Sequence, residues 1–465
     1  MSGFSLTLAE VAQALRLESE ANYARLTFPG VSTDTRNLKG GELFVALKGE
    51  RFNGHDYLKQ AFDKGAAAAV VNRHGELKGR LMLRVPDTLR ALGDLAAYLR
   101  RRQTLKVVAI TGSNGKTTTR EMTVRILKQS FNVLAASANF NNLIGLPLTL
   151  FNLRPEHQVA VLEMGTNRFG EISRLTEIAD PDVALVTSIA PAHLEGLGGL
   201  EGVARAKGEL YDGLKNGAVA LVNLDDPLVV RIAGTYSGPR LSFGFSRQAE
   251  VQARKLKHRG LKGSGFELVT PKGSVTVRLP LYGRHNISNA LAAAAVSLSM
   301  GVTPARIRDA LSGMKPFPGR LELKRLSGPI YLLDDTYNAN PVSVEAALSV
   351  LKRLKGRGRA VAVLGDMFEL GAESEAEHAR IGRVAAETGL DLLVGVGPLA
   401  KVLIGSARRT GLSRDRLHWF EDQDQAGLWL KAELRPLDRV LIKGSRGMHL
   451  ERIVSCLERQ EGGQG

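Results

Sequence analysis

The stretch AITGSNGKTTTREM, residues 109–122, decides how the middle of this chain folds. An apolar run, KVVAIT at 106–111, enters a glycine-rich turn, and a helical pattern follows at once. Glycines let backbone N–H groups close around phosphate oxygens, and the helix N-terminus adds a favourable dipole. Lys116 can reach the β- and γ-phosphates, while the Thr117 hydroxyl can bind magnesium. The stretch therefore predicts an ATP-binding turn made of Thr111, Gly112, Ser113, Asn114, Gly115, Lys116, Thr117 and Thr118.

This turn departs from the usual phosphate loop at one position. The usual pattern has a further glycine where this chain has Ile110. We interpret the turn as a shortened variant, because strand, loop and helix still come in the required order. Binding of ATP or GTP follows from the motif, but the reaction does not.

The sequence around the turn predicts a parallel sheet. Apolar runs recur at 159–162, 183–187 and 218–222, with helical segments between them. That alternation is typical of parallel strands joined by crossover helices. Alternating segments at 250–280 predict an antiparallel insertion, and an alanine-rich helix is expected from about 286 to 300.

The two ends of the chain predict further α/β domains. Short β-like runs at 42–47, 66–71 and 80–85 alternate with helical stretches, and TLAE at 7–10 reads as a capping box that opens a helix. From about residue 323 the pattern restarts with the strand candidates IYLLDD, RAVAVLG, DLLVGVG, RLHWF and DRVLIKG. We therefore expect an α/β protein of three domains: a small N-terminal one (1–103), a central parallel-sheet ATPase (104–322) and a doubly wound, Rossmann-like one (323–465).

Composition limits the class of protein. The 465 residues are 44% hydrophobic and 24% charged, which is ordinary for a soluble globular protein. The single cysteine, Cys456, cannot form an internal disulfide, and no leader or membrane-spanning run is evident, so we expect a cytoplasmic protein. Lysine and arginine exceed the acids by 63 − 47 = 16, and these charges are spread along the chain. A solvated basic surface and the binding of polyphosphate ligands both fit this excess.

Three further residues lie where strands of the predicted parallel sheet end. Glu163 closes the apolar run VAVLE, where it can hold magnesium, although a capping or salt-bridged glutamate is about equally common. His193, in the loop PAHLEGLGG after VALVT, is a candidate ligand for a second metal ion or a structural histidine. Lys207 follows in a helical stretch, and its spacing alone favours a surface lysine.

Taken together, these motifs resemble the Mur ligase family over essentially the whole chain. The segments TGSNGKTTT, LEMG, PAHLEG, GRHNISNALAA, FPGRLE and DDTYNANP occur in the order found in that family. The resemblance implies a shared ATP-and-metal set, all of it present here: Lys116, Glu163, His193, Asn286, Asn289, Arg320 and Asp335.

The resemblance also implies roles for these residues. Thr117 and Glu163 would bind one Mg²⁺ and His193 the second, while Lys207 matches a lysine that is carbamylated in relatives. With Lys116 and Arg320, these side chains would form the catalytic set. The remaining residues implied are Asn286 and Asn289 at the adenine, Arg320 at the phosphates and Asp335 at the ribose.

Within the family, the segments at 32–57, 139–150, 334–341 and 364–371 are similar to the enzyme that joins D-alanyl-D-alanine to UDP-muramoyl tripeptide through an acyl phosphate. The N-terminal domain would then bind the UDP-sugar and the C-terminal domain the dipeptide. The implied substrate-binding residues are Ser32, Asp34, Arg36, Asn139, Asn141, Asn142, Tyr337, Asn338, Asn340, Lys443, Ser445 and Arg446.

The resemblance implies two small-molecule substrates besides ATP and Mg²⁺, no organic prosthetic group, no nucleic acid partner and a monomer. Two alternatives remain within the same architecture: the ligase that adds the third residue of the peptide, and a folyl-polyglutamate-type synthetase. A nucleotide-binding regulator without ligase activity is an alternative of a different class.

Overall fold

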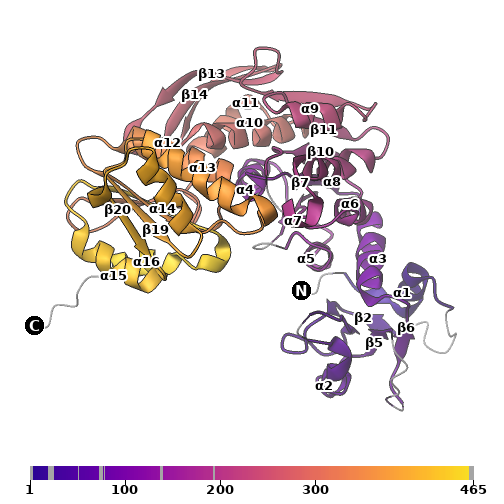
Figure 1. Cartoon of the computed structure of the whole chain (residues 1–465). Helices are drawn as coiled ribbons and strands as arrows, with labels where there is room; N and C mark the ends of the chain where they lie inside the picture. Colours follow the sequence, from indigo (N-terminus) through magenta and orange to yellow (C-terminus); the bar gives the residue numbers. More distant parts are fainter. Residues whose placement is uncertain are drawn as a thin grey trace, which may run out of the picture.

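The computed structural model describes most of the chain, and its elements are arranged as Figure 1 shows. Within the described residues, no helix is both long and apolar enough to cross a membrane. The described residues are 4–18, 26–50, 52–72, 77, 79–136, 140–191 and 194–459.

The N-terminal part is built on a parallel four-stranded sheet in the order β3-β4-β5-β6, with the antiparallel pair β1-β2 beside it. The predicted capping box is confirmed, since Thr7 and Glu10 bond each other's backbone N–H groups at the start of α1. The elements are β1 (Leu6–Thr7), α1 (Leu8–Leu15), β2 (Thr27–Phe28), β3 (Val31–Ser32), β4 (Leu43–Val45), η2 (Gly54–Tyr57), α2 (Leu58–Asp63), β5 (Ala68–Val71), β6 (Met82–Arg84) and α3 (Thr88–Arg101).

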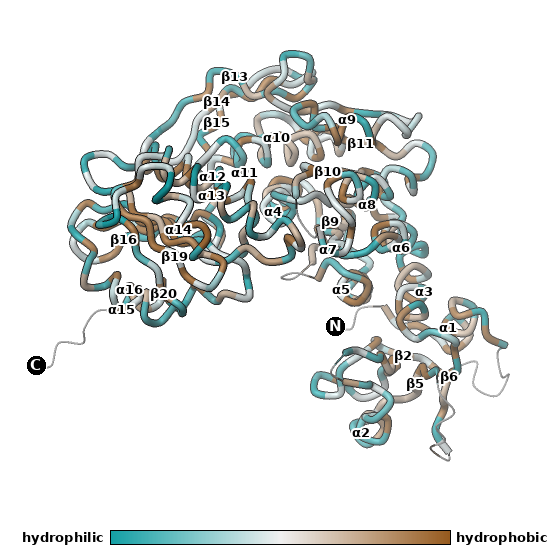
Figure 2. The backbone as a smooth tube through the Cα atoms, viewed as in Figure 1, coloured by the Kyte–Doolittle hydropathy of each residue, from teal (hydrophilic) through white to brown (hydrophobic). Residues whose placement is uncertain are grey.

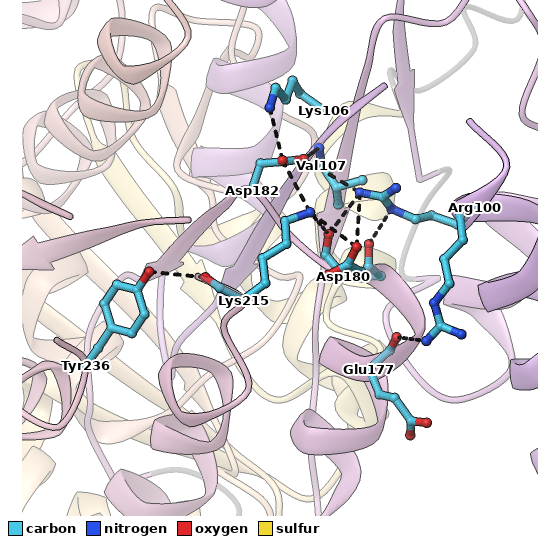
Figure 3. Close-up of polar contacts among 10 residues, drawn as sticks. Arg100, Lys106, Val107, Glu177, Asp180, Asp182, Lys215 and Tyr236 are labelled. Atoms are coloured by element: carbon cyan, nitrogen blue, oxygen red, sulfur yellow. Dashed lines mark hydrogen bonds and ion pairs between the residues drawn. The ribbon is translucent and has the colours of Figure 1, made fainter. Parts of the chain in front are cut away.

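Helix α3 joins this part to the rest of the molecule (Figure 1). Leu92 and Leu95 pack into the N-terminal core, while Ala96 and Ala97 pack into a core of the central sheet. Near its end the buried Arg100 donates to the carbonyls of Ala179 (2.8 Å) and Asp180 (2.9 Å) at the end of α6, as Figure 3 shows.

Acidic groups surround this arginine. The carboxylate of Asp182 lies 3.6 Å from Arg100 and 3.2 Å from Lys106, and accepts the Val107 N–H at 2.8 Å (Figure 3). Burial opposes ionisation of Asp182, but the Val107 hydrogen bond and the Lys106 and Lys215 ammonium groups hold its pKa below the usual value. Because the charges are paired and hydrogen-bonded, they fix the end of α3 against the central sheet.

The central sheet has nine strands in the order β15-β14-β13-β12-β11-β10-β7-β9-β8. The strands from β8 to β12 run parallel. Strands β13, β14 and β15 pair antiparallel with one another, as predicted for 250–280. The strands are β7 (Lys106–Thr111), β8 (Val133–Ala135), β9 (Val159–Glu163), β10 (Val183–Val186), β11 (Val219–Asn223), β12 (Arg240–Gly244), β13 (Val251–His258), β14 (Ser264–Thr270) and β15 (Gly273–Leu279).

Helices cover both faces of this sheet, which is why its parallel strands are almost continuously apolar. One face packs against α4, α10 and α11, and the other against α3, α5, α6, α8 and α9. The helices are α4 (Lys116–Leu127), α5 (Gly145–Leu150), α6 (Glu171–Ala179), α7 (Leu194–Leu197), α8 (Leu200–Asp212), α9 (Pro227–Ala233), α10 (Arg284–Ser299) and α11 (Pro304–Ser312).

The C-terminal sheet has six strands in the order β16-β17-β21-β18-β19-β20, all parallel except the edge strand β16. Helices lie on both faces, so the predicted doubly wound arrangement is confirmed. In Figure 2 the tube at β19 has the colour of hydrophobic residues. The elements are β16 (Glu322–Arg325), β17 (Tyr331–Asp334), α12 (Pro341–Leu354), β18 (Ala360–Gly365), η4 (Gly371–Glu373), α13 (Ser374–Glu387), β19 (Leu392–Val396), α14 (Ala400–Arg409), η5 (Arg414–Arg416), β20 (Leu417–Phe420), α15 (Gln423–Glu433), β21 (Arg439–Lys443), η6 (Arg446–Met448) and α16 (Glu451–Glu458).

The anchoring of α3 gives a direct test. We expect Arg100→Ala to lower the free energy of unfolding by about 3 kcal/mol, because it leaves buried carbonyl and carboxylate groups without their donor. Arg101→Ala is the matched control, since this neighbouring side chain is exposed and makes only a 3.5 Å contact with the Glu177 carbonyl. Urea unfolding measures both variants, and equal midpoints would contradict the anchoring role of Arg100.

Candidate functional site

The predicted phosphate loop joins the end of β7 to the start of α4. Gly112 has φ +144° and Gly115 has φ +82°, backbone conformations that side chains other than glycine rarely adopt. A Cβ atom added at Gly112 would overlap the Thr187 hydroxyl, and one at Gly115 would overlap the Asn289 amide oxygen. Glycine is therefore required at both positions for space as well as for conformation.

The loop is held against the residues that follow β10, the strand next to β7. The Thr187 hydroxyl donates to the Asn114 carbonyl at 2.6 Å. The Ser113 N–H donates to the Ser188 carbonyl (2.8 Å), and its hydroxyl donates to that of Ala190 (2.9 Å). These bonds fix the loop without using the N–H groups at the start of α4, so those donors can face a phosphate.

Two lysines come together below this loop. The Lys116 ammonium donates to the Gly112 carbonyl at 2.7 Å, and burial lowers its pKa, with Glu163 opposing that shift and Arg320 adding to it. Lys207 on α8 is only 1% exposed, and burial followed by the nearby Lys116 charge lowers its pKa well below the usual value. The surface position that spacing alone favoured for Lys207 is therefore wrong, because its helix faces the core here.

Glu163 ends β9 and is 2% exposed. One carboxylate oxygen accepts from the Asn141 amide at 2.9 Å, and the other lies 3.3 Å from the Arg120 guanidinium. That second oxygen is buried and accepts no hydrogen bond from any residue that the structure describes. An oxygen left in this way fits a ligand of a hard cation such as Mg²⁺.

The donor set also limits the kind of metal site. Within the described residues, no group of three or more histidine, cysteine, aspartate or glutamate side chains could hold an ion by itself. Mg²⁺ commonly takes one or two carboxylates together with phosphate oxygens and waters. Glu163 and the Thr117 hydroxyl fit a metal ion of that kind, shared with a nucleotide.

The C-terminal sheet presents an ion pair at the ends of β17 and β21. The Lys443 ammonium lies 2.8 Å from the Asp335 carboxylate and donates to the Asn338 carbonyl at 2.8 Å. Asp335 also accepts the Leu321 N–H at 3.1 Å. Burial raises the pKa of Asp335, although Lys443 opposes that rise.

Arg320 connects the two halves of the site. Its guanidinium lies 3.9 Å above the centre of the Tyr337 ring, and it is near enough to Lys116 and Asp335 to affect the pKa of both. A cation held between the loop and the C-terminal strand ends is placed to meet phosphate oxygens.

A direct hydrogen bond also crosses between the central and C-terminal sheets. The Asn340 amide donates to the Asn114 side-chain oxygen of the phosphate loop at 2.7 Å. Asn340 is at the same time the N-cap of α12, where it forms a capping box with Ser343. The start of α12 is therefore positioned by the loop itself.

The two asparagines of α10 lie beside the loop helix. The Asn289 amide donates to the Asn286 side-chain oxygen at 3.2 Å and accepts from the Thr119 hydroxyl at 3.3 Å. The Asn286 amide donates to the Tyr282 carbonyl at 2.8 Å. Their neighbour His285 was not predicted, and burial together with the Lys443 charge lowers its pKa to about 4.

The other predicted substrate residues divide into two groups. Ser32 ends β3, and Asp34 and Arg36 form a salt bridge at 2.7 Å just after it. Among the described residues, no hydrogen bond links Ser32, Asp34 or Arg36 to the phosphate loop. Asn142 caps α5 through the N–H groups of Ile144 and Gly145.

The second group lies after β21. Ser445 is 3% exposed and its hydroxyl accepts the Phe368 N–H, whereas the side chain of Arg446 is 63% exposed. Two predicted residues, Asn139 and His193, lie outside the described residues.

Matches to known families cover most of this architecture. Residues 27–100 match the Mur ligase family catalytic domain, 110–297 the Mur ligase middle domain and 319–446 the Mur ligase glutamate ligase domain. The chain belongs to the Mur ligase family. Strand β16 begins at Glu322, one residue before the predicted start of the third domain.

Individual Mur ligases resemble the chain over nearly its full length. UDP-N-acetylmuramoyl-tripeptide–D-alanyl-D-alanine ligase of Escherichia coli (strain K12) is 42% identical, and the match covers 98% of each chain. The crystal structure of MurF from Acinetobacter baumannii superposes with a TM-score of 0.89 at 35% identity, covering 99% of this chain and 100% of that one. MurF ligase from Thermotoga maritima, solved in complex with ADP, gives 0.83 at 29% identity, covering 92% and 97%.

The sequence held a signal for one residue that we did not single out. Arg120 lies one helical turn after Lys116 on α4, so both side chains leave the same face of that helix towards Glu163. The contact of Asn141 with Glu163 had no comparable signal, because it joins segments that only the fold brings together.

The two glycine conformations allow a controlled test of the loop. We expect Gly115→Ala to weaken ADP binding about 100-fold or more, because the new Cβ must displace Asn289 and the loop with it. Gly170→Ala is the matched control, since Gly170 has φ +83° and open space around its Cβ position. Calorimetric titration with ADP measures both. Equal affinities for the two variants would contradict the close packing of the loop.

Proposed function

We propose that the chain joins D-alanyl-D-alanine to UDP-N-acetylmuramoyl tripeptide, with ATP converted to ADP and phosphate. The supporting observation is a phosphate loop with half-buried Lys116 and buried Lys207 opposite the Asp335–Lys443 pair, in a chain whose near-full-length relatives carry that activity in their names.

The chemistry requires placement and charge neutralisation more than a protein nucleophile. A carboxylate oxygen of the tripeptide attacks the γ-phosphorus, the bond to the β-γ bridging oxygen breaks, and an acyl phosphate and ADP form. The dipeptide amine then attacks the acyl carbon, phosphate leaves, and the amine loses a proton. Lys116 and Arg320 stabilise the negative charge that moves across the phosphates during the first step.

We assign the metal ligands from the family resemblance and, for Thr117, Glu163 and Lys207, from their position around the loop. Glu163 and Thr117 would hold one Mg²⁺, with His193 and a carbamylated Lys207 at a second. Mg²⁺ would neutralise phosphate charge and orient the γ-phosphoryl group. A bare ammonium at Lys207 would repel a metal ion, whereas a carbamate would attract one.

The nucleotide would extend from the loop towards the C-terminal sheet. Asn286 and Asn289 would face the adenine, and Asp335 would take the ribose hydroxyls. In the structure these three side chains already bond other protein groups, so binding exchanges those hydrogen bonds for contacts to the nucleotide.

We propose that the three parts of the chain hold different substrates. Residues 1–103 would bind the UDP-sugar through Ser32, Asp34 and Arg36, residues 104–322 would bind ATP, and residues 323–465 the dipeptide. The enzyme would work in the cytoplasm, where ATP and UDP-linked substrates are found, as a monomer. The remaining substrate contacts would come from Asn139, Asn141, Asn142, Tyr337, Asn338, Asn340, Lys443, Ser445 and Arg446.

A substrate-omission assay tests this proposal. Phosphate release is expected only when UDP-muramoyl tripeptide, ATP, Mg²⁺ and D-alanyl-D-alanine are all present, and Lys116→Ala should abolish it while leaving the fold intact. Lys128→Ala, at the exposed end of the same helix, should leave turnover unchanged. Turnover with single amino acids in place of the dipeptide would favour the other ligases, and turnover without any acceptor would favour a nucleotide-binding regulator.

The state of Lys207 can be examined separately. Because its pKa is lowered, Lys207 is available as a neutral amine that attacks the carbon of CO2, forming a carbamate and releasing a proton. We expect a carbamate signal in the ¹³C NMR spectrum of protein equilibrated with ¹³C-bicarbonate, and its loss in Lys207→Met. A spectrum that is the same in both proteins would contradict the modification.

A further inference from the structure

Two short basic segments stand out among the many cations of this chain. RKLKHRGLK, residues 254–262, and KRLKGRGR, residues 352–359, contain no aspartate or glutamate. The ligase site uses a few buried cations and none of these. They account for a large part of the excess positive charge that the proposed function leaves unexplained.

The fold brings the two segments together on one surface. Residues 254–262 form the end of β13 and the short helix η3 (Gly260–Lys262), and η3 packs against α12, whose end carries the second segment. The Tyr282 hydroxyl donates to the Leu261 carbonyl at 2.7 Å, and its ring lies in the core that contains Val350 and Leu351. Figure 1 shows α12 below β13 and β14 in the upper left part of the molecule.

Most cations of this surface lack an acidic partner. Their neighbours Lys255 and Lys355 do have partners, Glu267 at 3.3 Å and Asp391 at 2.7 Å. Arg359 pairs with Glu433 and Asp438, and Arg254 donates to the Gln252 side chain. In the part of the chain that the structure describes, the six remaining lysines and arginines of the two segments form no ion pair, and all are exposed except the half-buried Arg259. We call these six the basic belt: Lys257, Arg259, Lys262, Lys352, Arg353 and Arg357.

Two leucines project among these charges. Leu256 is 44% exposed and Leu261 is 36% exposed, so two large apolar side chains lie among the cations of this surface. Between Arg254 and Lys257 the register with β14 shifts, and Lys255 takes φ +50°. A bulge of this kind breaks the in-and-out alternation of the strand and redirects its side chains, here towards solvent.

We propose that the basic belt and its two leucines dock the enzyme on the surface of an anionic phospholipid bilayer. Lysine and arginine are attracted to anionic headgroups, and short apolar side chains between them can enter the boundary between headgroups and acyl chains. Neither segment contains a phenylalanine, tyrosine or tryptophan, and His258 is the one aromatic ring in them, so they offer no row of rings for successive bases, which favours lipid over single-stranded nucleic acid.

The docking surface is independent of the ligase site. Its cations lie on hairpin and helix ends, whereas Lys116 is half-buried in the phosphate loop and Lys207 is buried in the central core. Vesicle binding can therefore be measured with the unmodified full chain in the absence of every substrate, and soluble-substrate turnover serves as a check of folding.

The experiment is co-sedimentation with vesicles of phosphatidylcholine, alone or mixed with phosphatidylglycerol, at low and at physiological salt. We expect binding only to the mixed vesicles, weakened by salt. The triple variants K257Q/R259Q/K262Q and K352Q/R353Q/R357Q should each bind about 100-fold more weakly, with turnover unchanged. The matched control R408Q/R409Q/K431Q removes three exposed cations elsewhere and should bind as the unmodified chain does.

A further variant separates lipid from other anionic partners. L256S/L261S keeps every charge, and we expect it to lose binding to the mixed vesicles at physiological salt. Equal binding by this variant would overturn the proposal in favour of a general polyanion site. Tighter binding of single-stranded DNA or polyglutamate than of the mixed vesicles would also favour a general polyanion site. The proposal would be overturned as well if the control were impaired as strongly as the belt variants, or if the unmodified chain bound no vesicles.

Discussion

The close approach of backbone around the phosphate loop is the constraint on which the rest of the molecule depends. Gly112 leaves no room for a side chain against Thr187, and Gly115 none against Asn289. These two contacts fix the loop between the end of β10 and the first turns of α10. A loop held from both sides keeps its N–H groups aimed at one point, and preorganised donors of this kind need no rearrangement when charge develops.

Positive charge is concentrated where the loop meets the C-terminal sheet. The half-buried Lys116 lies near the buried Lys207 and near Arg320, and Lys443 is paired with Asp335. Such a cluster is unfavourable by itself, because burial and mutual repulsion both act against the charged forms. A triphosphate with its metal ion would supply the missing negative charge. The same groups therefore attract the nucleotide, and the bound nucleotide would stabilise the approach of the central and C-terminal sheets.

The sequence was informative wherever local pattern determines structure. The turn at 109–122, the apolar strands that follow it and the restart near residue 323 all predict elements that the structure contains, since buried parallel strands leave a continuous apolar signature. The antiparallel edge strand β16 and the hydrogen bond from Asn340 to Asn114 left no such signature. Both depend on segments far apart in the chain, and a short half-buried strand such as ELKR has no distinctive period.

The basic surface also could not be predicted from the sequence alone. Along the chain the charges look evenly spread, because β14, β15, α10, α11, β16, β17 and most of α12 separate the two acid-free segments. Only the packing of η3 on α12 makes them one surface. Like charges gathered this way repel one another within the screening length of about 8 Å, and the fold gains no ion pair from the six that form the belt. A cluster that weakens the isolated fold and exposes two leucines is better explained by an anionic surface outside the molecule than by any requirement inside it.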